Sequence, residues 1–157
     1  MRGRFQWQVS VRIYASAAHV WDIADDISLI PQYHPEVGKV DLISGQQKRA
    51  VGVKYRCNIL EGRKGSCVEE VLEYIPYSKI STGMSEDTWG MDKMFSNFIV
   101  ETTVIPQGDR STMLQFEAYY DPIGFRNRVL NGLILRRIMR KRARLTMEGI
   151  KRLSEAR

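Results

Sequence analysis

The sequence has few of the residues that bind metals or form disulfide frameworks. It contains two cysteines, Cys57 and Cys67, and two histidines, His19 and His34. Neither pair has metal-ligand spacing. A structural zinc site also needs about four ligands and a catalytic one about three, which two scattered histidines and two separated cysteines do not supply. We therefore expect no metal and no other cofactor. Both cysteines are expected to be free, small core residues, with a cross-strand disulfide as the alternative.

Long apolar runs are also missing. No uncharged apolar stretch approaches the roughly 18 residues of a membrane-spanning helix. The N-terminal segment MRGRFQWQVSVRIY alternates polar and apolar residues and lacks the continuous apolar stretch of a signal peptide. The chain has no Pro-, Gly- or Ser-rich linker and no internal repeat. We expect a single soluble domain over residues 1–157, located in the cytoplasm.

Negative charge is scarce in the C-terminal part of the chain. Residues 122–157 contain eleven Lys and Arg against two Glu, a balance of +9. The first 121 residues contain thirteen Lys and Arg against sixteen Asp and Glu, a balance of −3. A mildly acidic body thus carries a strongly basic C-terminal element, and this contrast calls for an explanation.

Apolar residues recur with two different periods. In residues 5–14 they alternate with polar residues, which predicts a strand with one buried face. Ser16 is a predicted N-cap for a helix over residues 17–24, and a second short helix is expected over residues 28–33, before Pro35. Six strands are then predicted, at residues 37–44, 51–60, 67–75, 79–83, 95–105 and 111–120, with turns at 61–65 and 106–109 and an irregular segment at 84–94.

The period changes after Asp121, where the apolar residues fall on one arc of a helical wheel. Asp121 is the expected N-cap, Pro122 the first helical residue, and Gly132 a point of bending. Strands joined by short turns imply an antiparallel sheet, and a long helix with one apolar face must lie across it. We therefore expect an α+β, helix-grip fold of order β-α-α-β6-α. Its curved antiparallel sheet of about seven strands would wrap around the long C-terminal helix and leave an internal cavity.

This order of elements, together with four local motifs, resembles the START-like superfamily of helix-grip proteins. The motifs are VRIYASAAHVW at residues 11–21, ADDISLIPQYHPEV at 24–37, EEVLEY at 69–74 and the passage from the last strand into the helix at 116–122. Ser16 stands where the family often has Pro. The second motif is most similar to the coenzyme-Q-binding and polyketide cyclase branches. The resemblance implies a pocket for a hydrophobic or amphipathic small molecule, but it does not imply one reaction.

The resemblance also places a polar pair in that pocket. In cyclase-like chains, the residue three positions after a glycine equivalent to Gly52 and the Glu of the following strand tend to face the cavity. These are Tyr55 and Glu69, which lie opposite each other if the intervening turn centres on Gly62. A carboxylate beside a phenol in an apolar pocket can transfer protons, so both are candidate catalytic residues. The alternative is a solvent-facing Glu69 on an edge strand.

Other residues are candidates for contact with a ligand. Tyr33 and His34 lie at the expected pocket rim, with a polar loop histidine as the alternative for His34. Trp89 is either part of an apolar gate or a cover over the end of the core. The strand residues expected to line the concave face are Phe98, Val100, Phe116, Ala118 and Tyr120. Leu130, Leu133 and Ile134, on the first half of the helix, are expected to close it.

The basic run over residues 136–144 contains six Lys and Arg in nine positions. Arg136, Arg137, Arg140 and Arg144 can contact an anionic membrane or another anionic partner, with a solvated outer face as the alternative. Nucleic acid is a poor candidate because no aromatic residue interleaves with the run and no nucleic-acid motif accompanies it. Arg142 falls within the apolar arc, where it can reach a buried acid or a ligand, or extend its charged end to the end of the sheet.

These observations favour the binding, and as a further step the transport, of a hydrophobic small molecule in an internal cavity. The ligand classes that suit such a cavity are a lipid, an isoprenoid or quinone, and a polyketide-like aromatic. A cyclase or dehydratase that uses Glu69 and Tyr55 without a metal is the second hypothesis. An interaction module acting through the basic helix is the third.

Overall fold

The chain opens with a strand and a helical corner. The computed structural model describes residues 1–60 and 64–156, and its first elements are β1 (Phe5–Ile13), α1 (Ala17–Asp25), a 3-10 turn (Ile27–Leu29) and α2 (Ile30–Tyr33). Ser16 caps α1 as predicted, because its Oγ accepts a hydrogen bond from the backbone N–H of His19 at 3.3 Å. Trp21 of α1 is buried and packs against Tyr74, with ring centroids 5.6 Å apart.

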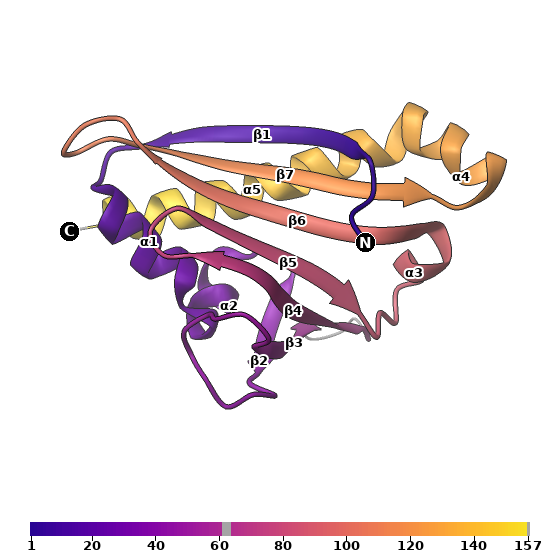
Figure 1. Ribbon diagram of the computed structural model, residues 1–157, viewed down its shortest axis with the longest axis horizontal. Helices are drawn as coiled ribbons and strands as arrows, with labels where there is room; N and C mark the ends of the chain where they lie inside the picture. The colour runs from indigo at the N-terminus through magenta and orange to yellow at the C-terminus, as the bar shows by residue number, and fades with distance from the viewer. Residues whose placement is uncertain (61–63, 157) are drawn as a thin grey trace.

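The sheet has seven antiparallel strands in the order β1-β7-β6-β5-β4-β3-β2 (Figure 1). After β1 these are β2 (Val37–Asp41), β3 (Lys54–Ile59), β4 (Ser66–Ile75), β5 (Lys79–Ser85), β6 (Phe95–Pro106) and β7 (Thr112–Pro122), with α3 (Met91–Met94) just before β6. The strand expected at 51–60 begins later, because Gly52 adopts a φ of +87° in the turn that precedes it. The predicted turn at 61–65 lies mostly outside the described residues. The predicted fold class is confirmed.

The C-terminal helix differs from its prediction in two places. It consists of α4 (Gly124–Leu130), a π-helical segment (Asn131–Leu135) and α5 (Arg136–Glu155). Pro122 ends β7 instead of starting the helix, and Asp121 is no N-cap, because its carboxylate accepts hydrogen bonds from Arg4 N and Asn97 Nδ2. Where a bend at Gly132 was expected, the helix has a π turn, which is wider than an α-helical turn and changes which side chains face the sheet.

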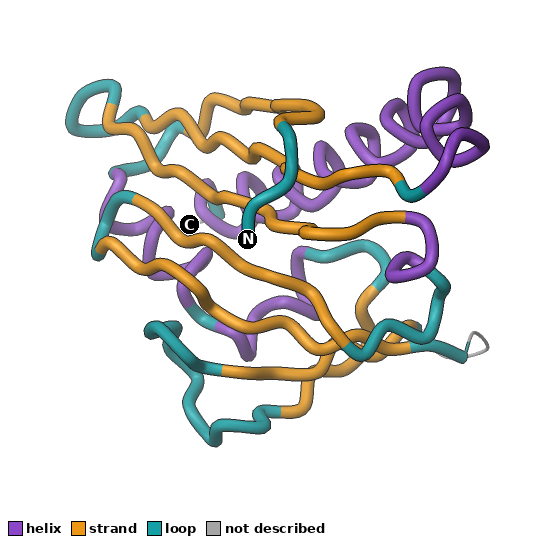
Figure 2. The backbone as a smooth tube through the Cα atoms, turned by 45° about the vertical axis from the view of Figure 1, so that its right-hand side comes forward, coloured by secondary structure: helices purple, strands orange, loops and turns teal. Residues whose placement is uncertain are grey.

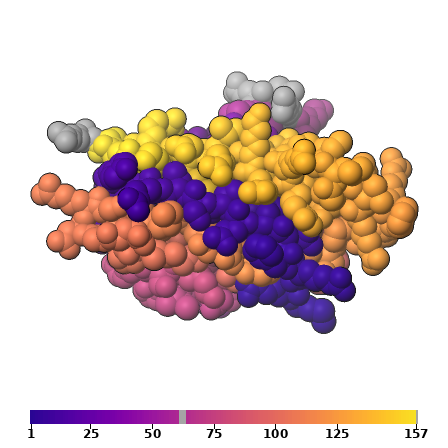
Figure 3. Space-filling view, turned by 90° about the horizontal axis from the view of Figure 1, so that it is seen from above, coloured from indigo at the N-terminus to yellow at the C-terminus, as the bar shows by residue number. Residues whose placement is uncertain are grey.

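The two halves of the helix have different surroundings. The second half of α5 packs against β1, α1 and α2 and buries Thr146, Met147, Gly149, Ile150 and Ser154. At the other end of the helix, α4 lies beyond the end of β1 (Figures 1 and 2). Figure 3 shows the same segment, in orange, projecting at one end of the molecule. The concave face is therefore covered mainly by the second half of the helix.

Candidate ligand-binding site

A hydrogen-bonded polar pair lies on the concave side of β3 and β4. Tyr55 pairs with Glu69 in the register of these strands, as predicted, and Cys57 pairs with Cys67. The Tyr55 side chain is fully buried, and its hydroxyl donates to Glu69 Oε2 at 2.5 Å. Burial raises the pKa of the Tyr55 phenol well above its ordinary value, so the hydroxyl keeps its proton and remains a donor. The carboxylate and the phenol therefore form one unit.

Arg49 extends this pair into a chain of three polar groups. It lies in the loop before β3, and only 9% of its surface is exposed. Its Nη2 donates to the Tyr55 hydroxyl at 3.1 Å, its Nη1 donates to the carbonyl of Ala24, and its backbone N–H donates to Asp25 Oδ1 at 3.2 Å. A buried guanidinium needs such partners. The sequence analysis missed Arg49 because the polar stretch around it resembles any exposed loop.

Tyr33 and His34, at the end of α2, border this chain of polar groups. Tyr33 is buried, and burial raises the pKa of its phenol, an effect that the nearby Arg49 opposes. Burial lowers the pKa of His34, an effect that Glu69 and Glu36 oppose. Nδ1 of His34 accepts a hydrogen bond from Glu36 N at 3.2 Å, so a neutral ring carries its proton on Nε2. The two residues thus join the concave-face cluster, although the sequence offered His34 no partner.

The cysteines face each other in the same region. Both are free and buried, as expected for small core residues, and the alternative of a disulfide is wrong. Burial raises the pKa of both thiols above their ordinary value, which makes them poor nucleophiles.

Most of the residues expected to line the concave face lie on its buried side. Phe116, Ala118 and Tyr120 are buried, Val100 pairs with Ala118 across β6 and β7, and Phe98 stacks on Tyr120 with centroids 5.1 Å apart. These positions agree with a lining role, which itself stays a prediction.

The helix positions differ from the expected lining. Leu130 is half-buried, but Leu133 is 65% exposed and Ile134 is 52% exposed. These two side chains do not close the concave face, because the π turn directs Asn131 toward the sheet and leaves Leu133 and Ile134 facing outward. The half-buried helix residues that pack against the core are Leu135, Met139 and Ala143.

Trp89 lies beside Gly65, which precedes β4. Its side chain is 40% exposed, and its indole occupies the space next to Gly65 so closely that no Cβ would fit there. The neighbouring Met91 and Met94 pack against the core. Trp89 therefore covers the open end of β3 and β4, a location compatible with either predicted role.

The basic residues of α5 have two different environments. Arg137, Arg140 and Arg144 are exposed, whereas Arg136 is half-buried and donates to Gln6 Oε1 at 3.0 Å. Arg142 Nε lies 3.2 Å from Glu36 Oε1, but the Arg142 side chain is 57% exposed and Glu36 is only half-buried, so this acid is not the buried one that was considered. In residues 1–60 and 64–156 no three potential ligand side chains gather into a metal-binding group. None of the helices in these ranges is both long enough and apolar enough to cross a bilayer.

The curved sheet and the long helix across it are those of a START-like, helix-grip protein. A family model described as "Polyketide cyclase / dehydrase and lipid transport" matches residues 4–155. The chain belongs to this family. The match agrees with the polyketide cyclase resemblance of the sequence and does not distinguish the coenzyme-Q-binding branch.

Solved structures of the same fold share little sequence with this chain. Norcoclaurine synthase from Thalictrum flavum, in complex with dopamine and hydroxybenzaldehyde, is 17% identical with a TM-score of 0.71, and the match covers 94% of this chain and 84% of that one. A START superfamily protein from Mycobacterium smegmatis is 18% identical with a TM-score of 0.64, covering 94% and 92% of the two chains. A protein from Nitrosospira multiformis is 12% identical with a TM-score of 0.74, covering 96% of each. At these identities the likeness shows the fold alone. No curated protein sequence matches the chain.

Proposed function

We propose that this protein binds a hydrophobic small molecule on the concave face of its sheet and holds the ligand's polar group with Glu69. The observation that carries this proposal is the chain of hydrogen bonds from Arg49 through Tyr55 to Glu69 on a largely apolar face. The Tyr55 hydroxyl takes part in both hydrogen bonds, accepting from Arg49 and donating to Glu69 Oε2. The other carboxylate oxygen, Glu69 Oε1, has no donor among the described residues. This oxygen can therefore accept a hydrogen bond from a hydroxyl or ammonium group of a ligand.

The apolar surroundings supply the driving force for such binding. Half-buried side chains that pack against the core leave surface that a ligand can cover, at about 25 cal/mol per Å² of apolar area removed from water. They include Met84, Met91, Met94, Phe98, Leu135 and Met139. Methionine adapts its shape to different partners, which suits a lipid, a quinone or an aromatic polyketide. The dopamine and hydroxybenzaldehyde in the related norcoclaurine synthase are small aromatic molecules, which supports ligands of that class.

Native mass spectrometry of the purified protein, followed by organic extraction, tests this proposal. We expect a co-purified apolar compound in the wild type, and at least about tenfold lower occupancy in Glu69→Gln, because a hydrogen bond to a carboxylate contributes about 1.5–3 kcal/mol. Glu70→Gln is the matched control, since Glu70 is the next residue on β4 and its carboxylate lies 3.5 Å from Lys54 Nζ on the other face. Equal occupancy in the two variants would contradict a role for Glu69. An absence of any apolar compound, together with failure to bind lipid, quinone and aromatic probes, would end the proposal.

A second candidate function is proton transfer to or from the bound ligand. The short contact between the Tyr55 hydroxyl and Glu69 favours it, because Tyr55 and Arg49 position the carboxylate that would take up the proton. In this case Glu69→Gln abolishes conversion of an extracted ligand, while Tyr55→Phe slows it. A ligand that returns chemically unchanged from the wild type supports binding alone.

We further propose that the exposed part of the helix docks on an anionic membrane, from which the ligand is loaded. Phe125 is 82% exposed and Leu133 65%, and Val129, between them at helical spacing, is 41% exposed. Exposed basic residues accompany this apolar row, among them Arg126, Arg137, Arg140, Lys141 and Arg144. Apolar side chains that insert between headgroups, next to arginines that bind them, are typical of interfacial helices.

Sedimentation with vesicles tests the docking surface. The wild type is expected to bind vesicles that contain phosphatidylglycerol and to bind pure phosphatidylcholine weakly. Phe125→Ser with Leu133→Ser should lower the bound fraction about tenfold or more, because each substitution removes roughly 2–3 kcal/mol of apolar burial at no cost to the core. Arg110→Gln, in the β6–β7 turn, is the control. Binding of RNA in place of vesicles, lost in Arg137→Gln with Arg140→Gln, would instead support a nucleic-acid interface.

A further inference from the structure

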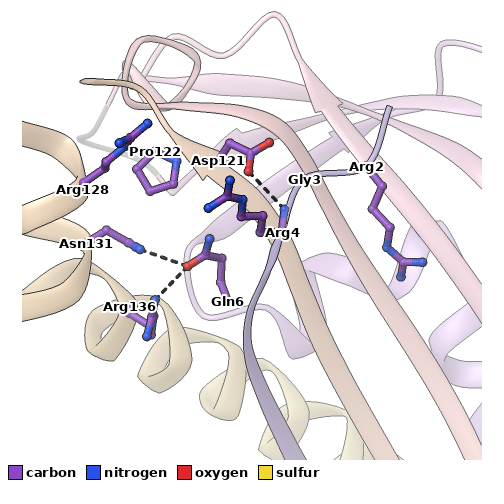
Figure 4. Close-up of a pocket in the computed structure, with 9 residues that line it drawn as sticks. All are labelled: Arg2, Gly3, Arg4, Gln6, Asp121, Pro122, Arg128, Asn131 and Arg136. Carbon is purple, nitrogen blue, oxygen red and sulfur yellow. Dashed lines mark hydrogen bonds between the residues drawn. The ribbon is translucent and has the colours of Figure 1, made fainter. Parts of the chain in front are cut away.

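A cleft of about 550 Å³ opens at the β1 edge of the sheet, far along the strand order from Glu69 on β4 (Figure 4). It lies where the N-terminal residues cross the end of β7 beside the π-helical segment. The polar residues that matter for its chemistry are Arg4, Gln6, Asp121, Arg128, Asn131 and Arg136. Its volume falls within the range of small-molecule sites, about 300–1,000 Å³.

The floor of the cleft is a fixed network of hydrogen bonds around Asn131, which is only 3% exposed. Asn131 Oδ1 accepts from the Tyr120 hydroxyl at 2.7 Å, and Asn131 Nδ2 donates to Gln6 Oε1 at 3.1 Å. Arg136 Nη2 donates to the same Gln6 oxygen at 3.0 Å. The π turn places Asn131 toward the sheet, and π turns are frequent at functional sites. The network therefore holds the guanidinium of Arg136 in a defined orientation.

The N-terminal segment is equally well held. Gly3 N donates to Asn97 O at 3.1 Å, and Arg4 O accepts from Tyr120 N at 3.0 Å. Gly3 lies so close to the Tyr120 backbone that a Cβ would come within 2.5 Å of it. Arg4 thus belongs to a segment whose backbone is held against β7, so its side chain stays at the cleft.

Positive charge in the cleft exceeds negative charge. Across the described residues, Arg4, Arg128 and Arg136 have no carboxylate within ion-pair distance, and Arg136 Nε is buried without an acceptor. Asp121 is the one carboxylate among the lining residues, and its two oxygens accept from Arg4 N and Asn97 Nδ2. A fourth lining arginine, Arg2, is paired with Glu101. The three remaining guanidinium groups against one carboxylate leave a balance of +2.

We propose that this cleft binds a phosphate group, carried either by a soluble small molecule or by a lipid headgroup. A balance of +2 matches a phosphate dianion, and the forked geometry of arginine suits phosphate oxygens. Arg136 contributes a fixed, partly desolvated donor, whereas Arg128 and Arg4 close on the ligand from the helix and the N-terminal segment. The site is independent of the concave face, so Glu69→Gln leaves it intact.

Calorimetric titration with inorganic pyrophosphate and with a short-chain phosphatidic acid below its micelle concentration tests the proposal. Arg128→Gln is expected to weaken binding of the phosphate probe about tenfold, and Arg136→Gln by more, because charge-assisted hydrogen bonds are roughly twice as strong as neutral ones. Arg110→Gln removes the same charge from the opposite end of β7 and should leave the affinity unchanged. Arg128 is exposed, so its variant remains informative even if Arg136→Gln fails to fold.

The pattern of results separates the two sources of phosphate. Binding of pyrophosphate indicates a soluble ligand, whereas binding of the phosphatidic acid alone indicates a headgroup. If Arg110→Gln weakens binding as much as Arg128→Gln does, the attraction is a property of the net charge and the proposal is wrong. Failure of both probes to bind, in a buffer of about 50 mM NaCl where screening is modest, would also overturn it.

Discussion

Replacement of Arg49 with methionine is expected to lower the free energy of unfolding by about 3 kcal/mol, because breaking a buried charged network costs roughly this much. The substitution keeps most of the side-chain volume but leaves the Ala24 carbonyl without its side-chain donor and the Tyr55 oxygen without its donor. Glu69 also loses a buried cation in its vicinity. Urea denaturation followed by circular dichroism measures the change.

Two further variants separate this network from a general effect of charge. Lys48→Met removes the neighbouring cation, whose side chain is 55% exposed, and should cost less than about 0.5 kcal/mol. Combining Arg49→Met with Glu69→Met should recover part of the lost stability, since replacing all members of a buried ionic group is far less harmful than removing one. An Arg49→Met protein as stable as the wild type, or additive costs in the double variant, would contradict the coupling.

The Tyr55–Glu69 pair could be predicted from the sequence, whereas Arg49 could not. Strand residues alternate between two faces, and a hairpin fixes which residues are opposite, so a local pattern determines the pair. The burial of Arg49 depends on contacts with Ala24 and Asp25, more than twenty residues earlier in the chain. A local sequence pattern does not reveal such a long-range contact. The neighbouring Lys48 is also a basic residue but is exposed, so residue type alone does not distinguish the two.

The helix illustrates the same limit. Its length and its amphipathic second half follow from a 3.6-residue period, so the element itself was predictable. At the π turn of Asn131–Leu135, Asn131 accepts a hydrogen bond from Tyr120 and donates one to Gln6, and both partners lie on distant strands. Because a π turn contains more residues than an α turn, it alters the helical phase and leaves Leu133 and Ile134 exposed. The expectations for these two residues were wrong for that reason, and Leu133 instead belongs to the exposed row proposed to meet a membrane.

Gly149→Ala is expected to destabilise the protein by about 2 kcal/mol, even though alanine is the better helix former by about 1 kcal/mol. A Cβ at this position would overlap the carbonyl oxygen of Tyr33 and lie 2.8 Å from its Cα. These are backbone atoms, which cannot rotate aside, so α5 must move away from α2. The movement would also displace Tyr33 and His34 from the Arg49–Glu69 cluster, and ligand occupancy should therefore fall together with stability.

Gly132→Ala supplies the matched control for this prediction. Gly132 lies in the same long helix, but nothing is within 4 Å of the position its Cβ would take. Its replacement should stabilise the protein by up to about 1 kcal/mol through helix propensity alone. The two glycine-to-alanine changes are thus expected to shift the urea midpoint in opposite directions. Shifts of the same sign would mean that α5 does not lie against the Tyr33 backbone, which would contradict the close packing between the helix and the proposed ligand site.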